Sequence, residues 1–149
     1  MNFNITSFFD STYLKTKEQS GLSDQEEKQV VKSFVLEAVE YRFKLVMIHS
    51  NHIAFAKAII ADNGSNVLVG TVIDFPLGEA SLEAKLSEAK QAIADGADEL
   101  DFVVNYQAFQ NGDVEGVRTQ INACTDLCLK NGKVIKWIIE IAALSDKEI

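Results

Sequence analysis

Long apolar runs are missing from this sequence, and so is an N-terminal segment with the composition of a targeting signal. The apolar stretches are short and interrupted by charged residues, so we expect no segment that spans a bilayer. Residues 1–4 contain no basic residue and no apolar run, which is unlike a signal peptide. From these absences we predict a cytoplasmic protein with no membrane partner.

Positive charge is scarce. The chain has 14 Lys and Arg residues against 22 Asp and Glu residues, and its net charge is −8 at pH 7. Nucleic-acid binding relies on Lys and Arg to neutralise phosphates, and no basic run occurs in the sequence. We therefore expect no nucleic-acid partner. A small phosphorylated substrate is still allowed, because a local pocket can oppose the net charge of the protein.

Cysteine is also scarce, and the two cysteines, Cys124 and Cys128, are four residues apart. On a helix this spacing places both thiols on one face, as a pair of metal ligands would be. The same spacing continues an apolar stripe through Val114, Val117 and Ile121. Free cysteine usually behaves as a small buried apolar residue, so we interpret the pair as core and predict no metal ion.

Linkers, low-complexity tracts and short repeats are absent, and proline occurs once. The chain has 149 residues, of which 47% are apolar, and this is enough for one domain with a core. We therefore predict a single domain over residues 1–149.

Short β-type runs alternate with longer amphipathic helices. A helix is indicated after Ser23, which precedes Glu26 at capping-box spacing. The Asp/Glu-rich segments at 24–28 and 79–90 are interpreted as solvated helix faces. Strands are expected over residues 5–9, 45–49, 67–73, 100–104 and 135–141. This alternation indicates right-handed βαβ units, so we predict an α/β fold with about five parallel strands.

The last residues, Ser145 to Glu148, are typical of the start of another helix. A natural domain rarely ends inside a helix. We therefore expect the chain to be the N-terminal part of a longer protein.

Several segments, in order, resemble the deoxyribose-phosphate aldolase family. The most specific is Gly96-Ala97-Asp98-Glu99-Leu100-Asp101-Phe102-Val103-Val104-Asn105, and it is followed by Ala108-Phe109 and Gly112. The other segments are Phe8 to Leu14, Val46 to Ala56, Gly70 to Gly78, and Lys136 to Glu140. Together these segments cover nearly the whole chain.

The resemblance implies a partial (β/α)₈ barrel, known as a TIM barrel. It also implies reversible aldol cleavage of 2-deoxyribose 5-phosphate to glyceraldehyde 3-phosphate and acetaldehyde, through a lysine Schiff base and without metal or cofactor. In this family the Schiff-base lysine lies on the sixth strand and its cationic partner on the seventh. We therefore expect this chain, with five strands, to be inactive alone. It should also bind a sugar phosphate weakly, since such barrels often hold phosphate in the loops after strands seven and eight.

Two aspartates are the candidate catalytic residues. By resemblance, Asp101 matches the catalytic aspartate of the family, and strand alternation places Glu99 and Asp101 on the face opposite Leu100 and Phe102. Asp10 matches the family's first-strand motif and is a weaker candidate for an active-site support. For Asp101 the alternative is a structural carboxylate, and for Asp10 it is a turn-capping aspartate.

Three further residues could suggest chemistry. Lys136 is expected to begin its strand, whereas barrel chemistry lies at the C-terminal ends of strands. We therefore interpret it as part of a buried ionic network on the barrel floor, with Glu140 on the same face and Glu99 on the neighbouring strand. His49 and His52 are three residues apart without a third ligand nearby. We predict no metal there, and we expect His49 to line the mouth of the barrel or a subunit contact.

The sequence departs from the family at four positions. These are Met47 for a frequent cysteine, Ser50 for proline, Asp74 for glycine or asparagine, and Ile141 for threonine. The departures bear on substrate fit more than on the fold.

Five strands cannot close a barrel, so the first and fifth strands should both be edge strands with unpaired backbone N–H and C=O groups. We therefore expect a homo-oligomer formed through exposed barrel edges. A non-catalytic, self-associating half-barrel and a different phosphate-binding barrel enzyme are the alternatives to an aldolase.

Overall fold

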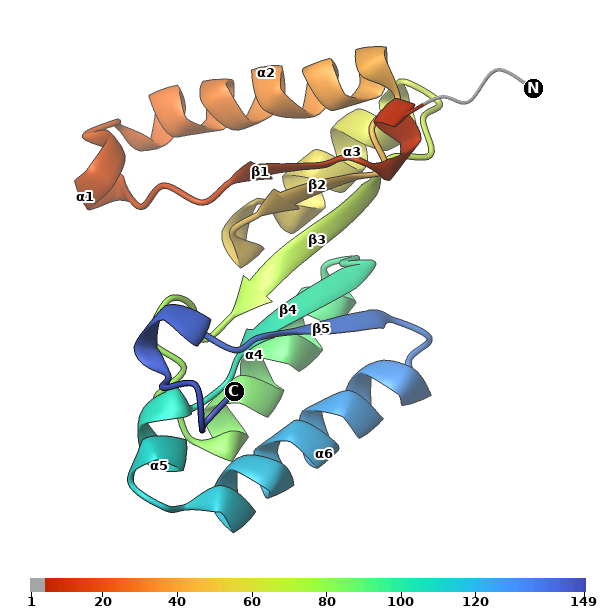
Figure 1. Cartoon of the computed structure of the whole chain (residues 1–149). Coiled ribbons are helices and arrows are strands. Elements are labelled where there is room, and N and C mark those ends of the chain that lie inside the picture. The colour runs from red at the N-terminus through yellow and green to blue at the C-terminus, as the bar shows by residue number, and fades with distance from the viewer. Residues whose placement is uncertain (1–4) are drawn as a thin grey trace. The chain divides into compact units, whose positions relative to one another are not determined.

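The structure, a computed structural model, describes residues 5–149 and shows strands that alternate with helices (Figure 1). The chain divides into two compact units. The first contains the chain up to Thr71 together with Asp95–Ala97, and the second contains Val72–Ala94 and Asp98–Ile149. The single domain over residues 1–149 stays a prediction.

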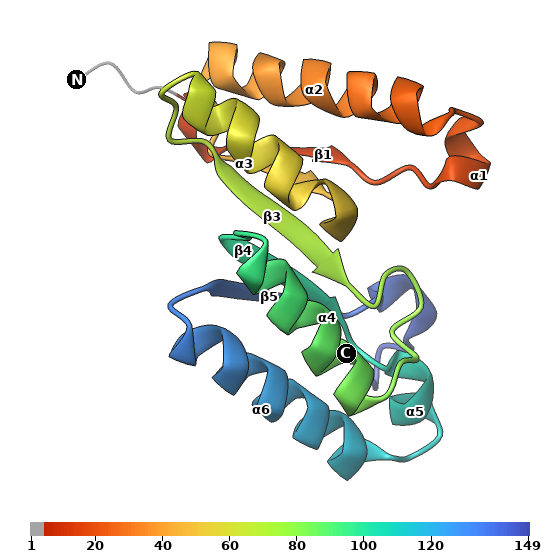
Figure 2. The same ribbon diagram turned by 180° about the vertical axis from the view of Figure 1, so that it is seen from behind.

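The first unit is a three-stranded parallel sheet with helices on one face (Figure 2). Its elements are η1 (Ile5–Phe8), β1 (Asp10–Tyr13), α1 (Lys17–Ser20), α2 (Asp24–Tyr41), β2 (Leu45–Ile48), η2 (Ser50–His52), α3 (Ile53–Asp62) and the start of β3 (Leu68–Ile73). In the register, Asp10 pairs with Leu45, and Leu45 pairs with Leu68. All four residues of β2 are buried, which is typical of a parallel strand covered on both faces.

The second unit holds the parallel pair β4 and β5, with α4 and α6 against one face (Figure 2). Its elements are the end of β3, α4 (Leu82–Ala94), β4 (Glu99–Val103), α5 (Tyr106–Gln110), α6 (Val114–Lys130), β5 (Val134–Ile138) and η3 (Ile141–Ala143). Phe102 of β4 and Trp137 of β5 are paired in the register, and their ring centroids lie 5.2 Å apart. The indole nitrogen of Trp137 donates to Thr125 Oγ1 of α6 at 3.4 Å, so this face points toward the helices.

The helix starts follow local signals in the sequence. The Ser23–Glu26 capping box is confirmed: the Ser23 hydroxyl accepts from the Glu26 N–H, and the Glu26 carboxylate accepts from the Ser23 N–H. At Ser145 and Glu148, the Glu148 carboxylate accepts from both the N–H and the hydroxyl of Ser145. The N–H groups of Glu148 and Ile149 donate to the Ser145 carbonyl oxygen. A helical turn therefore begins at residue 145, as the sequence indicates.

Two predicted strands are wrong in their bounds. Residues 5–8 form a 3₁₀-helix, and the first strand begins at Asp10. The Phe9 carbonyl oxygen accepts from the N–H groups of Lys44 and Leu45, and the Thr6 hydroxyl donates to the Tyr41 carbonyl oxygen at the end of α2. The fifth strand ends at Ile138, because Glu140 adopts left-handed backbone angles (φ 50°, ψ 54°) that no strand accommodates. The short helices α1 and α5 were not expected from the sequence.

The described part of the chain contains no helix long and apolar enough to cross a membrane.

Candidate active site

Asp101 lies in the middle of β4, directly across from Lys136 of β5. The Lys136 ammonium lies 3.8 Å from Asp101 Oδ2 and makes a closer ion pair with Glu99 Oε1. Since Phe102 and Trp137 face the helices, strand alternation places Asp101 and Lys136 on the opposite face of the pair. Two carboxylates and one ammonium thus form a charged cluster on that face.

The members of this cluster differ in their access to solvent. The side chain of Glu99 is 2% exposed and that of Asp101 is 15% exposed, whereas that of Lys136 is 41% exposed. The pair of Lys136 and Glu99 from the expected network is therefore present, with Asp101 as a third member. The expected place of Glu140 on the same strand face is wrong, because β5 ends at Ile138 and Glu140 has left-handed backbone angles. Lys136 lies in the middle of β5 and is half-exposed, whereas the sequence predicted a buried lysine at the beginning of the strand. Asp101 remains the member whose carboxylate is both close to a cation and reachable from outside.

A second charged cluster supports the end of β4. The side chain of Lys85, from α4, is completely buried, and its ammonium donates to the carbonyl oxygen of Val103 at 2.7 Å. The same ammonium lies 3.3 Å from Asp74 Oδ2, in the loop after β3. A lysine without solvent must satisfy its donors inside the protein, so this ammonium links the loop to the C-terminal end of the strand that carries Asp101.

The interpretation of residues 24–28 and 79–90 as solvated faces is wrong for Glu27 and for Lys85, which are both buried. This lysine lies four residues before Ala89 and seven before Ala92, and all three are buried. The helical spacing was therefore the signal in the sequence that could have identified it. The charge of Lys85 wrongly indicated exposure, because in the fold its ammonium is paired with the Asp74 carboxylate and bonded to the Val103 carbonyl oxygen.

Asp74 explains one departure from the family pattern. Its φ is +55°, a left-handed conformation that glycine and asparagine adopt most easily and that aspartate tolerates. Asp74 Oδ2 accepts from the Ala80 N–H at 2.8 Å, and the Asp74 carbonyl accepts from the Gly78 N–H at 2.9 Å. The loop approaches β4 so closely that a Cβ at Gly78 would lie 2.4 Å from the Val104 carbonyl oxygen. Aspartate thus keeps the turn and adds the ion pair to Lys85.

Asp10 is the first residue of β1, in the first unit, and Asp101 belongs to the second unit. Asp10 Oδ1 lies 3.5 Å from the ammonium of Lys44, the residue before β2. This ion pair joins the starts of two neighbouring strands, which is a structural role. The support of chemistry by Asp10 stays a prediction.

The two histidines have separate surroundings in the first unit. His49 Nε2 lies 3.0 Å from the Leu14 carbonyl oxygen, so His49 holds the segment that follows β1. His52 is buried, and its Nε2 lies 3.5 Å from Glu27 Oε1 of α2. Their different partners show that the three-residue spacing does not bring the rings to a common point.

Cys124 and Cys128 are buried free thiols on α6, as the apolar stripe predicts. Burial raises the pKa of Cys124, against a smaller opposite effect of the Lys85 ammonium. Burial, and then the neighbouring Cys124, raise the pKa of Cys128 to about 11. The thiolate is the reactive form of cysteine, and a raised pKa keeps both side chains in the thiol form. We therefore interpret both cysteines as core residues. Val114, at the start of the stripe, is an exception and is 41% exposed.

Comparisons with known proteins agree with this picture. The sequence profile of the DeoC/LacD family aldolases matches residues 15–149. A deoxyribose-phosphate aldolase of Staphylococcus haemolyticus is 37% identical over 145 residues, which are 97% of this chain and 60% of the relative. One of Thermococcus kodakarensis is 35% identical over 88% of this chain and 58% of the relative.

Solved structures show the same likeness. The deoxyribose phosphate aldolase of Aeropyrum pernix, described as tetrameric, superposes with a TM-score of 0.80 at 29% identity over 96% of this chain and 55% of its own. The aldolase QR15 superposes with a TM-score of 0.82 at 29% identity over 97% of this chain and 59% of its own. The predicted α/β fold, a part of a (β/α)₈ barrel with five parallel strands, is thereby confirmed.

The chain belongs to a class of α/β-barrel aldolases. Within that class it is a member of the DeoC/LacD aldolase family, as the ordered sequence segments indicate, and it spans about 60% of the length of the curated relatives it matches.

Proposed function

We propose that this chain provides the carboxylate half of a deoxyribose-phosphate aldolase site. The reaction is the reversible cleavage of 2-deoxyribose 5-phosphate, a small phosphorylated sugar, to glyceraldehyde 3-phosphate and acetaldehyde in the cytoplasm. The observation that carries the proposal is Asp101, which is 15% exposed and faces the ammonium of Lys136 at 3.8 Å. The likeness to relatives named as deoxyribose-phosphate aldolases supports the choice of substrate.

The chemical task of Asp101 follows from the reaction. A Schiff-base aldolase must remove a proton from a substrate hydroxyl as the carbon–carbon bond breaks, and must move protons among the carbinolamine and enamine species. A carboxylate in reach of substrate performs both transfers. The Lys85 and Asp74 pair holds the strand end two residues further on, which keeps the carboxylate in one place.

Lys136 is not the nucleophile in this proposal. An amine attacks a carbonyl only when it is neutral, and two carboxylates within reach of its nitrogen favour the ammonium form. The chain alone therefore lacks the Schiff-base step.

Borohydride trapping tests this account. The chain is incubated with 2-deoxyribose 5-phosphate and borohydride, and its intact mass is measured. We expect no covalent adduct on this chain and a reduced adduct on the Staphylococcus haemolyticus relative treated in parallel. An adduct on a single lysine, lost in the Lys136→Met variant, would contradict the assignment.

A second candidate function is self-association. In the first unit, the 3₁₀-helix and the residue before β1 carry Ile5, Phe8 and Phe9, which are 57%, 65% and 46% exposed. In the second unit, Val134 at the start of β5 is 50% exposed and Ile139 after it is 47% exposed. Each set lies beside the outer strand of its unit, β1 or β5, whose backbone has one strand partner within that unit.

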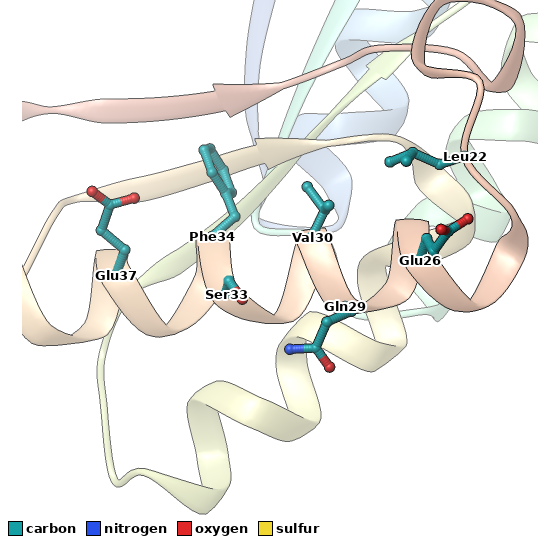
Figure 3. A pocket seen from close by; sticks show the side chains of 7 residues that line it. All are labelled: Leu22, Glu26, Gln29, Val30, Ser33, Phe34 and Glu37. Carbon is teal, nitrogen blue, oxygen red and sulfur yellow. The ribbon is translucent and has the colours of Figure 1, made fainter.

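A groove on α2 adds to the apolar surface of the first unit. Figure 3 shows Leu22, Val30 and Phe34 on one side of the helix, with Gln29 turned away from them. Exposed apolar surface beside an outer strand is typical of an interface. We propose that copies of the chain associate through these strands, and the tetrameric description of the Aeropyrum pernix aldolase supports association within the family.

Sedimentation velocity over a range of concentrations tests the association. We expect a dimer or larger species, and we expect Phe8→Asp to shift it toward monomer. Leu129→Asp is the matched control, because Leu129 is 64% exposed but lies on α6. A chain that remains monomeric at all concentrations would exclude this function.

A further inference from the structure

Three helices of this chain end in the same type of backbone turn. α3, α5 and α6 are each followed by an asparagine and then a glycine, namely Asn63-Gly64, Asn111-Gly112 and Asn131-Gly132. The glycines have φ values of 58°, 89° and 65°. In each case the glycine N–H donates to the carbonyl three residues back, and the next N–H donates to the carbonyl five residues back. These are three copies of the Schellman helix ending.

The asparagine side chains of the three copies differ. The Nδ2 of Asn63 donates to the Ile59 carbonyl at 2.8 Å, and the Nδ2 of Asn131 donates to the Leu127 carbonyl at 2.8 Å. Across residues 5–149, the side-chain amide of Asn111 forms no hydrogen bond of this kind; only its backbone N–H is bonded. Two side chains are therefore tied to the helix they end, and the third is free to rotate.

We propose that Asn111 is a site of spontaneous modification by succinimide formation. The backbone nitrogen of Gly112 attacks Cγ of Asn111 and loses its proton, the bond between Cγ and Nδ2 breaks, and ammonia leaves. Water then opens the ring at either carbonyl, giving aspartate or isoaspartate. Glycine favours this step because it has no side chain to obstruct the ring, and all three sites share it.

Two features separate Asn111 from its counterparts. At Asn63 and Asn131 the side-chain hydrogen bond must break before Cγ can approach the glycine nitrogen, and one such bond corresponds to a roughly fivefold population difference. In addition, α5 has 5 residues, whereas α3 has 10 and α6 has 17. A shorter helix opens more readily, which releases the Gly112 N–H from the Phe109 carbonyl. Both features accelerate the reaction at Asn111.

The product changes the turn between α5 and α6. The ring consumes the Gly112 N–H, so the bond to the Phe109 carbonyl is lost. Ring opening then places a carboxylate two residues before Asp113, whose own carboxylate accepts from the Gly116 N–H at 3.0 Å to cap α6. Phe109 and Val114, on either side of this turn, line an apolar pocket of the second unit. The modification therefore adds negative charge beside that pocket and, as isoaspartate, one extra backbone carbon.

Peptide mapping by mass spectrometry measures the modification. The folded chain is incubated in mildly alkaline buffer, and trypsin then separates the three sites into peptides 58–85, 91–118 and 131–133. Fragment ions assign the conversion of amide to acid to a residue, and they distinguish Asn111 from Asn105 in the same peptide. We expect Asn111 to be converted at least roughly fivefold faster than Asn63 or Asn131.

Incubation in concentrated urea is the control. Without the fold all three asparagines precede glycine in a flexible chain, so their rates should become similar. Equal rates at the three sites in the folded chain would overturn the proposal. Protection of Asn111 in the folded chain, with conversion in urea, would overturn it as well.

Discussion

Lys85 shows how a single charged side chain can determine local structure. Its ammonium is fully buried, and both of its acceptors, the Asp74 carboxylate and the Val103 carbonyl, lie outside its own helix. Lys85→Met keeps the length of the side chain but leaves the Asp74 carboxylate without its cation. We expect a loss of about 3 kcal/mol in the free energy of unfolding, measured by urea denaturation with Trp137 fluorescence. Lys90→Met, on an exposed position of the same helix, should change it by less than about 0.5 kcal/mol.

A double-mutant cycle separates the ion pair from other effects of the substitution. Asn accepts the left-handed conformation of Asp74, so Asp74→Asn removes the charge and keeps the turn. The combined Lys85→Met and Asp74→Asn variant should lose less stability than the sum of the two single variants, because it leaves no unpaired buried charge. Additive losses would show that the pair is not coupled.

At the scale of the residue, the sequence predicted which face a side chain occupies better than it predicted the groups that the side chain contacts. The motif and the alternation of β4 identified Asp101 and its face, and the helical stripe identified the buried cysteines. The role of Lys85 was missed because its acceptors come from distant parts of the chain. Its burial becomes favourable only when the loop after β3 and the end of β4 meet the helix.

At the scale of the element, the capping box of α2 offers a test that depends on pH. Hydrogen bonds from the Ser23 side chain and backbone lower the pKa of Glu26 from its usual 4.5. A carboxylate with a lowered pKa stabilises the fold above the unfolded value, and this contribution is lost as the pH falls through the folded pKa. Ser23→Ala should cost about 1 kcal/mol at neutral pH and progressively less as the pH falls below 4.5.

Thermal or urea unfolding at several pH values measures this loss. Ser33→Ala, at an exposed interior position of the same helix, is the matched control and should cost nothing at any pH, since alanine is the better helix former. A loss for Ser23→Ala that does not depend on pH would exclude a contribution from the hydrogen bond that the Ser23 hydroxyl donates to the Glu26 carboxylate.

The elements that the sequence predicted correctly are those with a strong period or a local cap. α2, α3, α4 and α6 have apolar stripes, and β2 and β3 are continuous apolar runs. The strand predicted over residues 5–9 is wrong, because the apolar composition of Ile5, Phe8 and Phe9 is typical of a strand. In the structure these residues belong to a 3₁₀ turn, in which the Thr6 hydroxyl donates to the Tyr41 carbonyl oxygen at the end of α2 and the Phe9 carbonyl oxygen accepts from the N–H groups of Lys44 and Leu45. Such a contact, between residues more than thirty positions apart, leaves no local signal.

At the scale of the whole molecule, the role of Asp101 can be tested by completing the barrel. A chimaera joins this chain to the part of the Staphylococcus haemolyticus aldolase that lies beyond the matched 60%. We expect it to cleave 2-deoxyribose 5-phosphate, and we expect Asp101→Asn to lower kcat by a factor of about 10² to 10⁴ with the fold retained. Asp126→Asn, at an exposed position on α6, is the control and should leave kcat unchanged. An active Asp101→Asn chimaera would assign that carboxylate to structure.

The sequence by itself determined the α/β class, the family and the periodic helices, because these depend on composition, spacing and ordered motifs, which lie along the chain. Only the tertiary structure decided that Lys85 is buried, that Lys136 joins Glu99 and Asp101, and that Asp10 pairs with Lys44. It also decided which of three identical Asn-Gly endings has a free side chain. The physical reason is the same in each case. Burial and pairing depend on groups that are distant in the sequence and become neighbours only when strands and helices pack.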